Sequence, residues 1–549
     1  MSKKSPFKQN NAPQYQNSTM PSFLVSCYLM LMFSFFPYFL TDEYAHARTD
    51  KYYLYLVLSI LLIVSVVIAS VMDYMEERRV HRATLRFMPL SPADVSFLCF
   101  YGFAAISTLL SDNTEAAFFG IFSNNGLYLG GRNNGLLLMT FYLLVYLIIT
   151  RRYAVKEYII AVFLVFSSGV AFLAIVNYFY IDVLGIYTGY VDLWKLFAGE
   201  QCKPTVVLDF GSTLGNKNLI SAFMCLFLPV AVMSLVLGSK RWLRIIGGVT
   251  SVFAYCGMLC ADSLSGILGL IVILAVMAIF ASREYRTMKR YLLALTVMFA
   301  SGKLLRIFSA IMDDRSKGFE FVQQSLIYGK KVYFLIAVCA VLYLLMQVFE
   351  KKLEPRYPKK AVMITLIVLS AGGLAAGLFA FVYFSFINTE AQLSETLSGL
   401  LRFDENWGTH RGYYWIKSMD EYKNFSFVHK LFGTGPDSVY VVMEPYFPEM
   451  VVKFDEGSTD CVHNEFLNYF ISQGILGLIS YLALLGTVTV RALRRAKENP
   501  VVLIFLSAVI CYAVQSVVNL YQPITTPLFF LFLTITEAIN RLTPLKKAS

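Results

Sequence analysis

Long apolar runs alternate with shorter polar connectors along almost the whole chain. About fourteen runs of roughly 18–22 residues are each long enough to cross a hydrocarbon core of ~30 Å as a helix. They fall at 22–40, 52–72, 93–110, 134–150, 157–177, 219–237, 243–260, 265–281, 291–308, 332–349, 361–384, 466–488, 501–520 and 524–540. Only helices and closed barrels satisfy their backbone hydrogen bonds in lipid, and these runs are too long for barrel strands. The pattern predicts an all-α polytopic membrane protein with about 14 transmembrane helices, within a range of about 12–14.

One polar insertion, 385–465, is much longer than the other connectors and precedes the run at 466–488. Its segments "YYWIKSM" and "VYVVMEPYFPEMVV" are too apolar for a disordered loop. The turn "FGTGPDS", with Gly433, Gly435 and Pro436, reverses the chain after a helix that we expect to start near Arg411. The insertion therefore predicts a folded cap on the membrane surface.

The composition agrees with a membrane protein. Apolar residues make up 57% of the 549 residues, charged residues 15%, and the mean hydropathy is +0.59. These values lie outside the usual range of soluble proteins.

The net charge of +11 could suggest a nucleic-acid partner, but the basic residues gather in alternate connectors. This is the positive-inside pattern, which reports membrane topology, and no basic and aromatic soluble domain accompanies it. We therefore expect no nucleic acid and a multi-pass protein of the cell membrane. The basic connectors contain Arg78, Arg79, Arg82, Arg86, Arg151, Arg152, Lys156, Lys240, Arg241, Arg244, Arg283, Arg286, Lys289, Arg290, Lys351, Lys352, Arg356, Lys359, Lys360, Arg491, Arg494, Arg495 and Lys497.

This topology places both termini in the cytoplasm and four connectors, 111–133, 178–216, 309–331 and 385–465, on the outer face. The expected organisation is a disordered cytoplasmic tail (1–21), a helix bundle (22–384), an extracytoplasmic cap (385–465), C-terminal helices (466–540) and a cytoplasmic tail (541–549). Two runs are less apolar than the others: 291–308 contains Lys303 and Arg306, and 524–540 contains Glu537.

His463 and Asn464, followed by Glu465, stand where the cap meets the run at 466–488. One interpretation is a histidine that caps an interfacial helix beside a polar patch. The other is a general base, because a neutral imidazole with a reference pKa of about 6.5 can take a proton from a hydroxyl. Asn464 and Glu465 would then add hydrogen-bonding groups for a substrate.

Arg411 and Arg402 are the cationic candidates within the cap. Either could form a salt bridge with Asp404 or Glu405 or extend along the membrane surface. Alternatively, the planar guanidinium binds a diphosphate. Spacing alone does not separate these interpretations.

A third candidate site precedes the run at 219–237. Asn216, Lys217 and Asn218 in "STLGNKNLISAF" could place a helix N-terminus on an anion, or could simply cap the helix. Arg132 in "GGRNNGLLL" holds a similar position ahead of the run at 134–150.

Several site classes are absent from the sequence. It contains no Walker A loop and no His, Cys or Asp cluster with zinc spacing. We therefore expect no metal and no nucleotide cofactor. Cys202 and Cys461 both fall in predicted outer connectors, where a disulfide between them is one possibility and two free thiols the other.

Residues 205–485 resemble the O-antigen ligase and polymerase family of bacterial envelope glycan transferases. The ending His-Asn-Glu, followed by two glycines directly after a large outer loop, is the most specific part of the resemblance. The matching residues are Asn216, Asn218, the segment "ADSLSGILGL", Arg411, Trp415, Gly433, Gly435, Pro436, His463, Asn464, Glu465, Leu467, Gly474 and Gly477.

The resemblance implies a metal-independent glycosyltransferase that uses a polyprenyl-diphosphate-linked glycan as donor and a glycan or lipid-glycan hydroxyl as acceptor. It implies that His463 is the catalytic base and that Arg411 contacts the diphosphate, together with Arg132 and Arg402. Ligase and polymerase differ in the acceptor, and the sequence does not choose between them.

Two departures keep other functions open. Leu264 stands where the family usually has an arginine, so Lys217 or Arg306 replaces that charge, or donor binding differs, or activity is lost. The family also commonly has about twelve spans, two fewer than the pattern predicts here. A lipid-linked oligosaccharide flippase and a catalytically inactive envelope-assembly scaffold are the alternatives.

Overall fold

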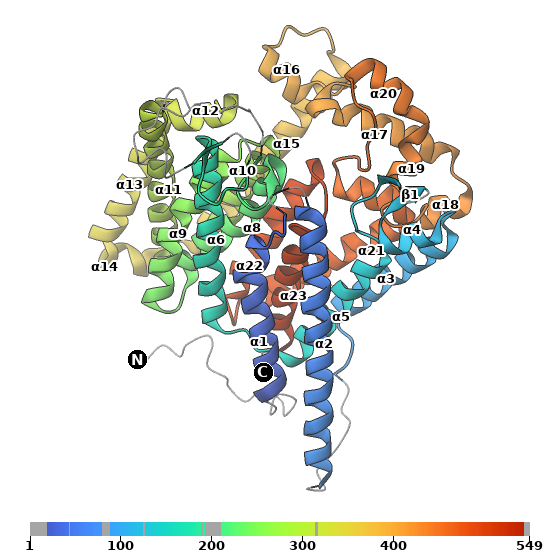
Figure 1. Ribbon diagram of the computed structural model, residues 1–549. Helices are drawn as coiled ribbons and strands as arrows, with labels where there is room; N and C mark the ends of the chain where they lie inside the picture. The colour runs from blue at the N-terminus through green and yellow to red at the C-terminus, as the bar shows by residue number, and fades with distance from the viewer. Residues whose placement is uncertain are drawn as a thin grey trace.

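The computed structural model describes residues 19–42, 44, 46–79, 88–124, 127–187, 190–192, 210–312 and 317–542, and these residues are mainly helical (Figure 1). Each of the apolar runs corresponds to a helix. The helices are α1 (Thr19–Ser34), α2 (Ala47–Arg79), α3 (Pro92–Leu110), α5 (Leu136–Arg152), α6 (Glu157–Tyr178), α8 (Lys217–Leu237), α9 (Arg241–Cys260), α10 (Leu264–Ala281), α11 (Tyr285–Ile311), α13 (Lys331–Val348), α15 (Lys359–Val382), α21 (Glu465–Arg495), α22 (Val502–Gln515) and α23 (Thr526–Leu542).

Within the described ranges, 11 helices are long and apolar enough to cross a membrane. The helices α5, α22 and α23, with 17, 14 and 17 residues, are shorter. The structure therefore confirms an all-α polytopic protein, whereas the count of about fourteen crossings stays a prediction. The first helix begins at Thr19, inside the segment expected to form the N-terminal tail.

The centre of the bundle is α8 together with α22 and α23. Nearly all of the apolar part of α8 is buried, and α22 and α23 are buried along most of their length. By contrast, α13 and α15 expose most or all of their apolar side chains. In a bilayer, lipid rather than protein covers such surfaces.

The four connectors predicted to lie outside meet at one end of the bundle. The backbone N–H of Lys317 donates to the carbonyl of Tyr178, and the N–H of Glu320 donates to Asp262. At this end lie α4 (Thr114–Phe119), α12 (Phe321–Tyr328) and the strand pairs β1 (Phe122–Asn124) with β2 (Leu127–Gly130), β3 (Ile181–Asp182) with β4 (Val191–Asp192), and β5 (Phe210–Gly211) with β6 (Gly215–Asn216).

The segment 385–465 covers this end as a helical cap, shown in orange in Figure 1. The side chains of Tyr413, Val439, Met443 and Met450 form its own small apolar core. Its elements, after the π-helical turn η5 (Tyr383–Ile387), are α16 (Glu395–Leu401), α17 (Trp407–Asn424), α18 (Phe427–Phe432), α19 (Val439–Met443), η6 (Glu444–Tyr446) and α20 (Phe447–Phe454).

Buried ion pairs join the helices at the opposite end. Asp94 in α3 is fully buried and contacts both Arg151 and Arg541. Glu537 in α23 pairs with Arg491 at 2.9 Å. Because an unpaired buried charge is costly, these contacts hold the ends of α3, α5, α21 and α23 together.

Candidate active site beneath the cap

The helix α17 is entered through three consecutive left-handed residues. Gly408, Thr409 and His410 have φ angles of 64°, 61° and 64°. This conformation is unfavourable for residues with a Cβ and persists only where the surroundings enforce it. The right-handed helix starts at Arg411, as the sequence predicts, and Nη1 of Arg411 donates to the carbonyl of Gly408 at 2.6 Å.

The guanidinium of Arg411 is half-buried, and its Nε has no hydrogen-bond partner among the described residues. The predicted alternative of a salt bridge to Glu405 is not formed, because Glu405 pairs with Lys453 at 2.7 Å. Within the described ranges Arg411 makes no ion pair. Most of its hydrogen-bonding capacity is therefore available to a ligand.

The positive charge of Arg411 acts on the second candidate residue, His463. Its ring stacks on that of Tyr414 with centroids 5.9 Å apart, and its φ of 51° is left-handed. The Nδ1 atom is buried and forms no hydrogen bond with any described residue. Burial, followed by the positive charges of Arg411 and Arg132, lowers the pKa of His463 well below 6.5. The imidazole is therefore neutral at neutral pH, the state that a base requires.

The backbone of Val462, directly before His463, is fixed by side chains from the cap and the bundle. Trp415 Nε1 donates to the carbonyl of Val462 at 2.8 Å, and the N–H of Val462 donates to Asn468 at 3.0 Å. These contacts hold the strained conformation of His463 in place.

Asn464 and Glu465 take structural roles in the helix that follows. The side chain of Asn464 caps α21 by accepting the N–H of Leu467 at 3.0 Å. Glu465 is fully buried and accepts the hydroxyl of Tyr481 at 2.6 Å. The helix-capping interpretation offered for His463 thus applies to Asn464, and Glu465 faces the bundle interior.

Arg132 is held by an acidic residue of the cap. Its Nε and Nη2 contact the same carboxylate oxygen of Asp460 at 2.7 and 2.6 Å. Its charge still acts on His463, whose pKa it lowers. In this structure Arg132 therefore joins the cap to the connector before α5 and contributes positive charge beside the imidazole.

Asp437 is a site residue that the sequence reasoning missed. It belongs to the turn after Gly435, is almost fully buried, and accepts the backbone N–H groups of Arg132 and Asn134. Burial is the main cause that raises the pKa of Asp437 to about 7. An aspartate directly after the Pro436 of a glycine-bracketed turn was the available signal, because such residues often bind neighbouring backbone.

Arg402 makes its described hydrogen bond elsewhere in the cap. Its Nη2 donates to the carbonyl of Ala391 at 2.8 Å, within the N-terminal half of the cap. Among the described residues, no hydrogen bond joins Arg402 to His463 or Arg411.

Asn216 caps α8 by accepting the N–H of Asn218 at 2.8 Å, which supports the simple capping interpretation. Asn218 in turn accepts the hydroxyl of Ser263 at 2.7 Å. Lys217 pairs with Glu320 at 3.1 Å. The Glu320 carboxylate also acts electrostatically on Arg411.

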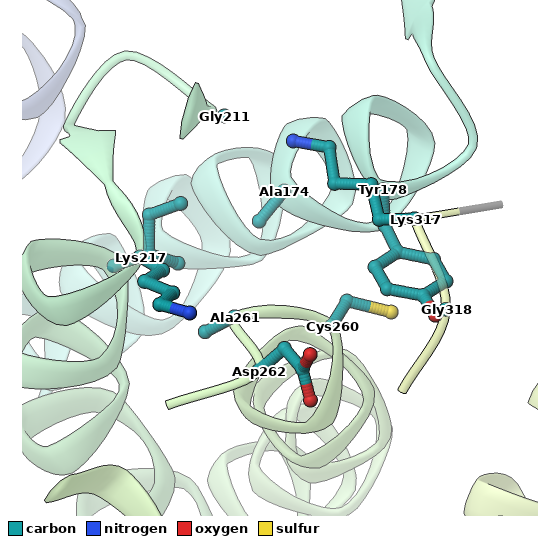
Figure 2. Close-up of a pocket in the computed structure, with 10 residues that line it drawn as sticks. Ala174, Tyr178, Gly211, Lys217, Cys260, Ala261, Asp262, Lys317 and Gly318 are labelled. Atoms are coloured by element: carbon teal, nitrogen blue, oxygen red, sulfur yellow. The ribbon is translucent and has the colours of Figure 1, made fainter. Parts of the chain in front are cut away.

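A small polar pocket of about 50 Å³ adjoins Lys217. Figure 2 shows the Lys217 ammonium beside Ala261, whereas the Asp262 carboxylate points to the other side, below Cys260; both residues line the pocket. The pocket has room for a few waters but not for a sugar. Of the two cations proposed to replace the family arginine at Leu264, Lys217 lines this pocket, whereas Arg306 is exposed on α11.

The cysteine and metal predictions have different outcomes. Cys461 is a buried free thiol. Cys202 lies outside the described residues, so the bridge between the two stays a prediction. In the described part of the chain, no three His, Cys, Asp or Glu side chains gather in a way that could hold a metal ion.

A model of a known protein family matches part of the chain. Residues 326–482 match the family model described as O-antigen ligase. The match runs from α12 through α13, α15 and the cap into α21, and it contains both Arg411 and His463. No curated protein matches the chain.

Proposed function

Because this chain carries a domain of the O-antigen ligase family over residues 326–482, we propose that it is a membrane glycosyltransferase of cell-surface polysaccharide assembly. It transfers or polymerises a glycan, carried on a polyprenyl diphosphate, onto an acceptor hydroxyl at the outer face of the membrane. The reaction takes place beneath the cap, and the lipid carrier reaches it through the bilayer.

One observation supports the proposal: a neutral imidazole lies within electrostatic reach of a guanidinium that has no carboxylate partner among the described residues. Burial and two positive charges lower the pKa of His463, so its ring can accept a proton. Arg411 makes no ion pair within the described ranges, so its planar fork can bind a phosphate group. A base and a diphosphate-binding group are the two parts that this transfer needs.

The reaction follows from these two groups. His463 accepts the proton of the acceptor hydroxyl while the hydroxyl oxygen attacks the anomeric carbon of the donor glycan. The bond between that carbon and the diphosphate oxygen breaks, and its electron pair stays on the diphosphate. Arg411 stabilises the negative charge that develops there, which lowers the barrier without a metal ion. Lys217, which pairs with Glu320, adds a second cation on the side of α8.

The sharpest test replaces His463 by Asn. Asparagine tolerates a left-handed backbone, so the strained conformation is kept while the base is lost. Purified native protein, His463→Asn and His429→Asn are compared in transfer from a polyprenyl-diphosphate glycan. We expect His463→Asn to lose about 10²–10⁴-fold in rate. His429, a half-exposed cap histidine on α18, serves as the matched control, and its substitution should leave the rate unchanged.

The same assay separates the alternatives. A flippase would translocate the donor without forming a glycosidic bond, and an inactive scaffold would form none either. Absence of transfer by the native protein with every acceptor tested, or an unchanged rate in His463→Asn, would falsify the proposal. Acceptor glycans with and without a lipid anchor distinguish ligase from polymerase.

A further inference from the structure

A second pocket lies at the end of the bundle opposite the cap, between the starts of α6 and α9. Its volume is about 380 Å³, within the range of about 300–1,000 Å³ that is typical of small-molecule sites. The far ends of the same helices, Tyr178 and Cys260, line the small pocket near the cap. The two pockets are therefore separated by the length of these helices.

Two helix N-termini converge on this pocket, each carrying a lysine. Lys156 is the N-cap of α6 and Lys240 the N-cap of α9, and neither side chain caps its helix. The first backbone N–H groups and the helix dipoles of both elements therefore remain available to an anion. Together with the two ammonium groups, they make the pocket suited to a phosphate.

A buried carboxylate in the same pocket favours a hydrogen-bond donor, in addition to the anion favoured by the lysines and helix N-termini. The side chain of Glu157 is only 4% exposed, and its Oε1 accepts the hydroxyl of Ser239. The Oε2 atom is buried and accepts no hydrogen bond from a described residue, although the Lys240 ammonium lies 3.4 Å away. This carboxylate oxygen is therefore ion-paired but lacks a well-directed hydrogen bond, and a ligand that brings a donor would be favoured here.

Two half-exposed aromatic rings place the pocket at the bilayer surface. Tyr158 is 39% and Trp242 38% exposed, and the ammonium groups of Lys156 and Lys240 lie 5.9 Å from their respective ring centroids. Both helices are long and apolar enough to cross a membrane. Tyrosine and tryptophan in this position lie at the level of lipid headgroups.

We propose that this pocket binds the headgroup of a glycerophospholipid that carries both a phosphate and a terminal hydrogen-bond donor. The phosphate contacts Lys156, Lys240 and the two helix N-termini, and the donor satisfies Glu157. Phosphatidylethanolamine and phosphatidylglycerol supply such a donor, as an ammonium and as hydroxyls. Phosphatidylcholine has the same phosphate but no donor. The acyl chains lie along Tyr158 and Trp242.

The test measures lipid retained by the full-length protein in native mass spectrometry after titration with each of these three lipids. We expect the ethanolamine or the glycerol lipid to bind at least tenfold more tightly than the choline lipid, and their comparison identifies the donor. The double substitution Lys156→Ala with Lys240→Ala should lower retention at least tenfold. Both lysines are exposed, so this variant is expected to fold.

Two further variants make the result specific. Glu157→Gln should lower the preference over the choline lipid more than it lowers total retention, because the phosphate contacts remain. Lys351→Ala with Lys352→Ala changes two exposed lysines of α14 (Glu350–Leu353) that do not line the pocket, and should change nothing. Equal retention of all three lipids by the native protein, or native retention by the Lys156 and Lys240 variant, overturns the proposal.

Discussion

At the scale of single residues, burial and the charges around His463 decide its protonation. Its Nδ1 atom is buried, which is the main cause of the lowered pKa, and the positive charges of Arg411 and Arg132 further disfavour the imidazolium form. The sequence places a histidine and an arginine in the same loop, but it does not show that the arginine lowers the pKa of the histidine. That effect depends on the fold of the cap.

We expect Arg411→Gln to change the pH profile as well as the rate. Removing the guanidinium removes a positive charge that lowers the pKa of His463, so the pKa rises and the acid limb of kcat/KM moves to higher pH. The rate near neutral pH should fall by about 10²–10³-fold because the diphosphate loses a partner. Transfer assays between pH 4.5 and 8 measure both effects.

Arg402→Gln is the matched control for this prediction, because Arg402 lies in the same cap and does not act on His463. An acid limb that moves equally in both variants, or in neither, contradicts the role assigned to Arg411.

Asp437 should make the stability of the protein depend on pH. Burial raises the pKa of Asp437 from 3.8 to about 7, so the folded state binds this proton more tightly than the unfolded state. The resulting contribution to the free energy of unfolding is fully present below pH 3.8 and is lost as the pH rises through about 7. The shift sets an upper bound of about 4 kcal/mol. Asp437→Asn keeps an acceptor oxygen but cannot ionise. The difference in Tm between Asp437→Asn and the native protein should therefore grow in favour of the variant from pH 5 to pH 8. A Tm difference that stays constant over this range would refute the raised pKa of Asp437.

At the scale of elements, the junction between the cap turn and α21 depends on two glycines. Gly433 and Gly474 both have left-handed φ angles, of 77° and 68°. A Cβ on Gly433 would lie 2.3 Å from the backbone of Ser472, and one on Gly474 would lie 2.3 Å from the backbone of Leu431. The turn and the kinked helix therefore pack backbone against backbone, which only glycine permits.

Gly474→Ala should disrupt this junction, because neither backbone can move away without separating α18 from α21. We expect reduced yield of folded protein and, in what folds, loss of transfer activity. Gly486→Ala in the same helix meets nothing within 4 Å and should be neutral or slightly stabilising. Size-exclusion profiles and Tm values of the two variants check the difference, and similar behaviour of both would contradict the close packing.

The helices themselves follow from the sequence because each apolar run has a length set by the bilayer. The local backbone conformations of the cap do not follow from the sequence. Nothing in "NWGTHRG" indicates that Thr409 and His410 are left-handed, since that conformation is imposed by tertiary contacts. The two glycines of the junction are visible in the sequence, but their contact joins segments about forty residues apart.

At the scale of the whole molecule, the alternating charges predict which connectors share an end of the bundle. The four predicted outer connectors meet at one end, and the basic connectors around Arg151, Lys240 and Arg495 lie at the other. Which end faces the cytoplasm stays a prediction from the positive-inside rule.

Cysteine labelling in intact cells tests that orientation. Val452→Cys on α20 replaces an 86% exposed side chain of the cap, and Lys352→Cys replaces an exposed side chain at the opposite end. We expect a membrane-impermeant maleimide to label the first variant and not the second, each compared with the native chain. Labelling of the second alone would place the cap inside the cell and remove the proposed function.

The exposure of α15 has a consequence for handling the protein outside a membrane. No residue of this helix is buried, yet it carries the N-terminal half of the cap, whereas the C-terminal half is fastened to the bundle through Asp437 and Asp460. Detergents that strip bound lipid will therefore destabilise α15 more than the central helices of the bundle. Heating in a harsh detergent should release α15 and α16 while the central helices still hold, giving two melting steps that merge into one when lipid is restored.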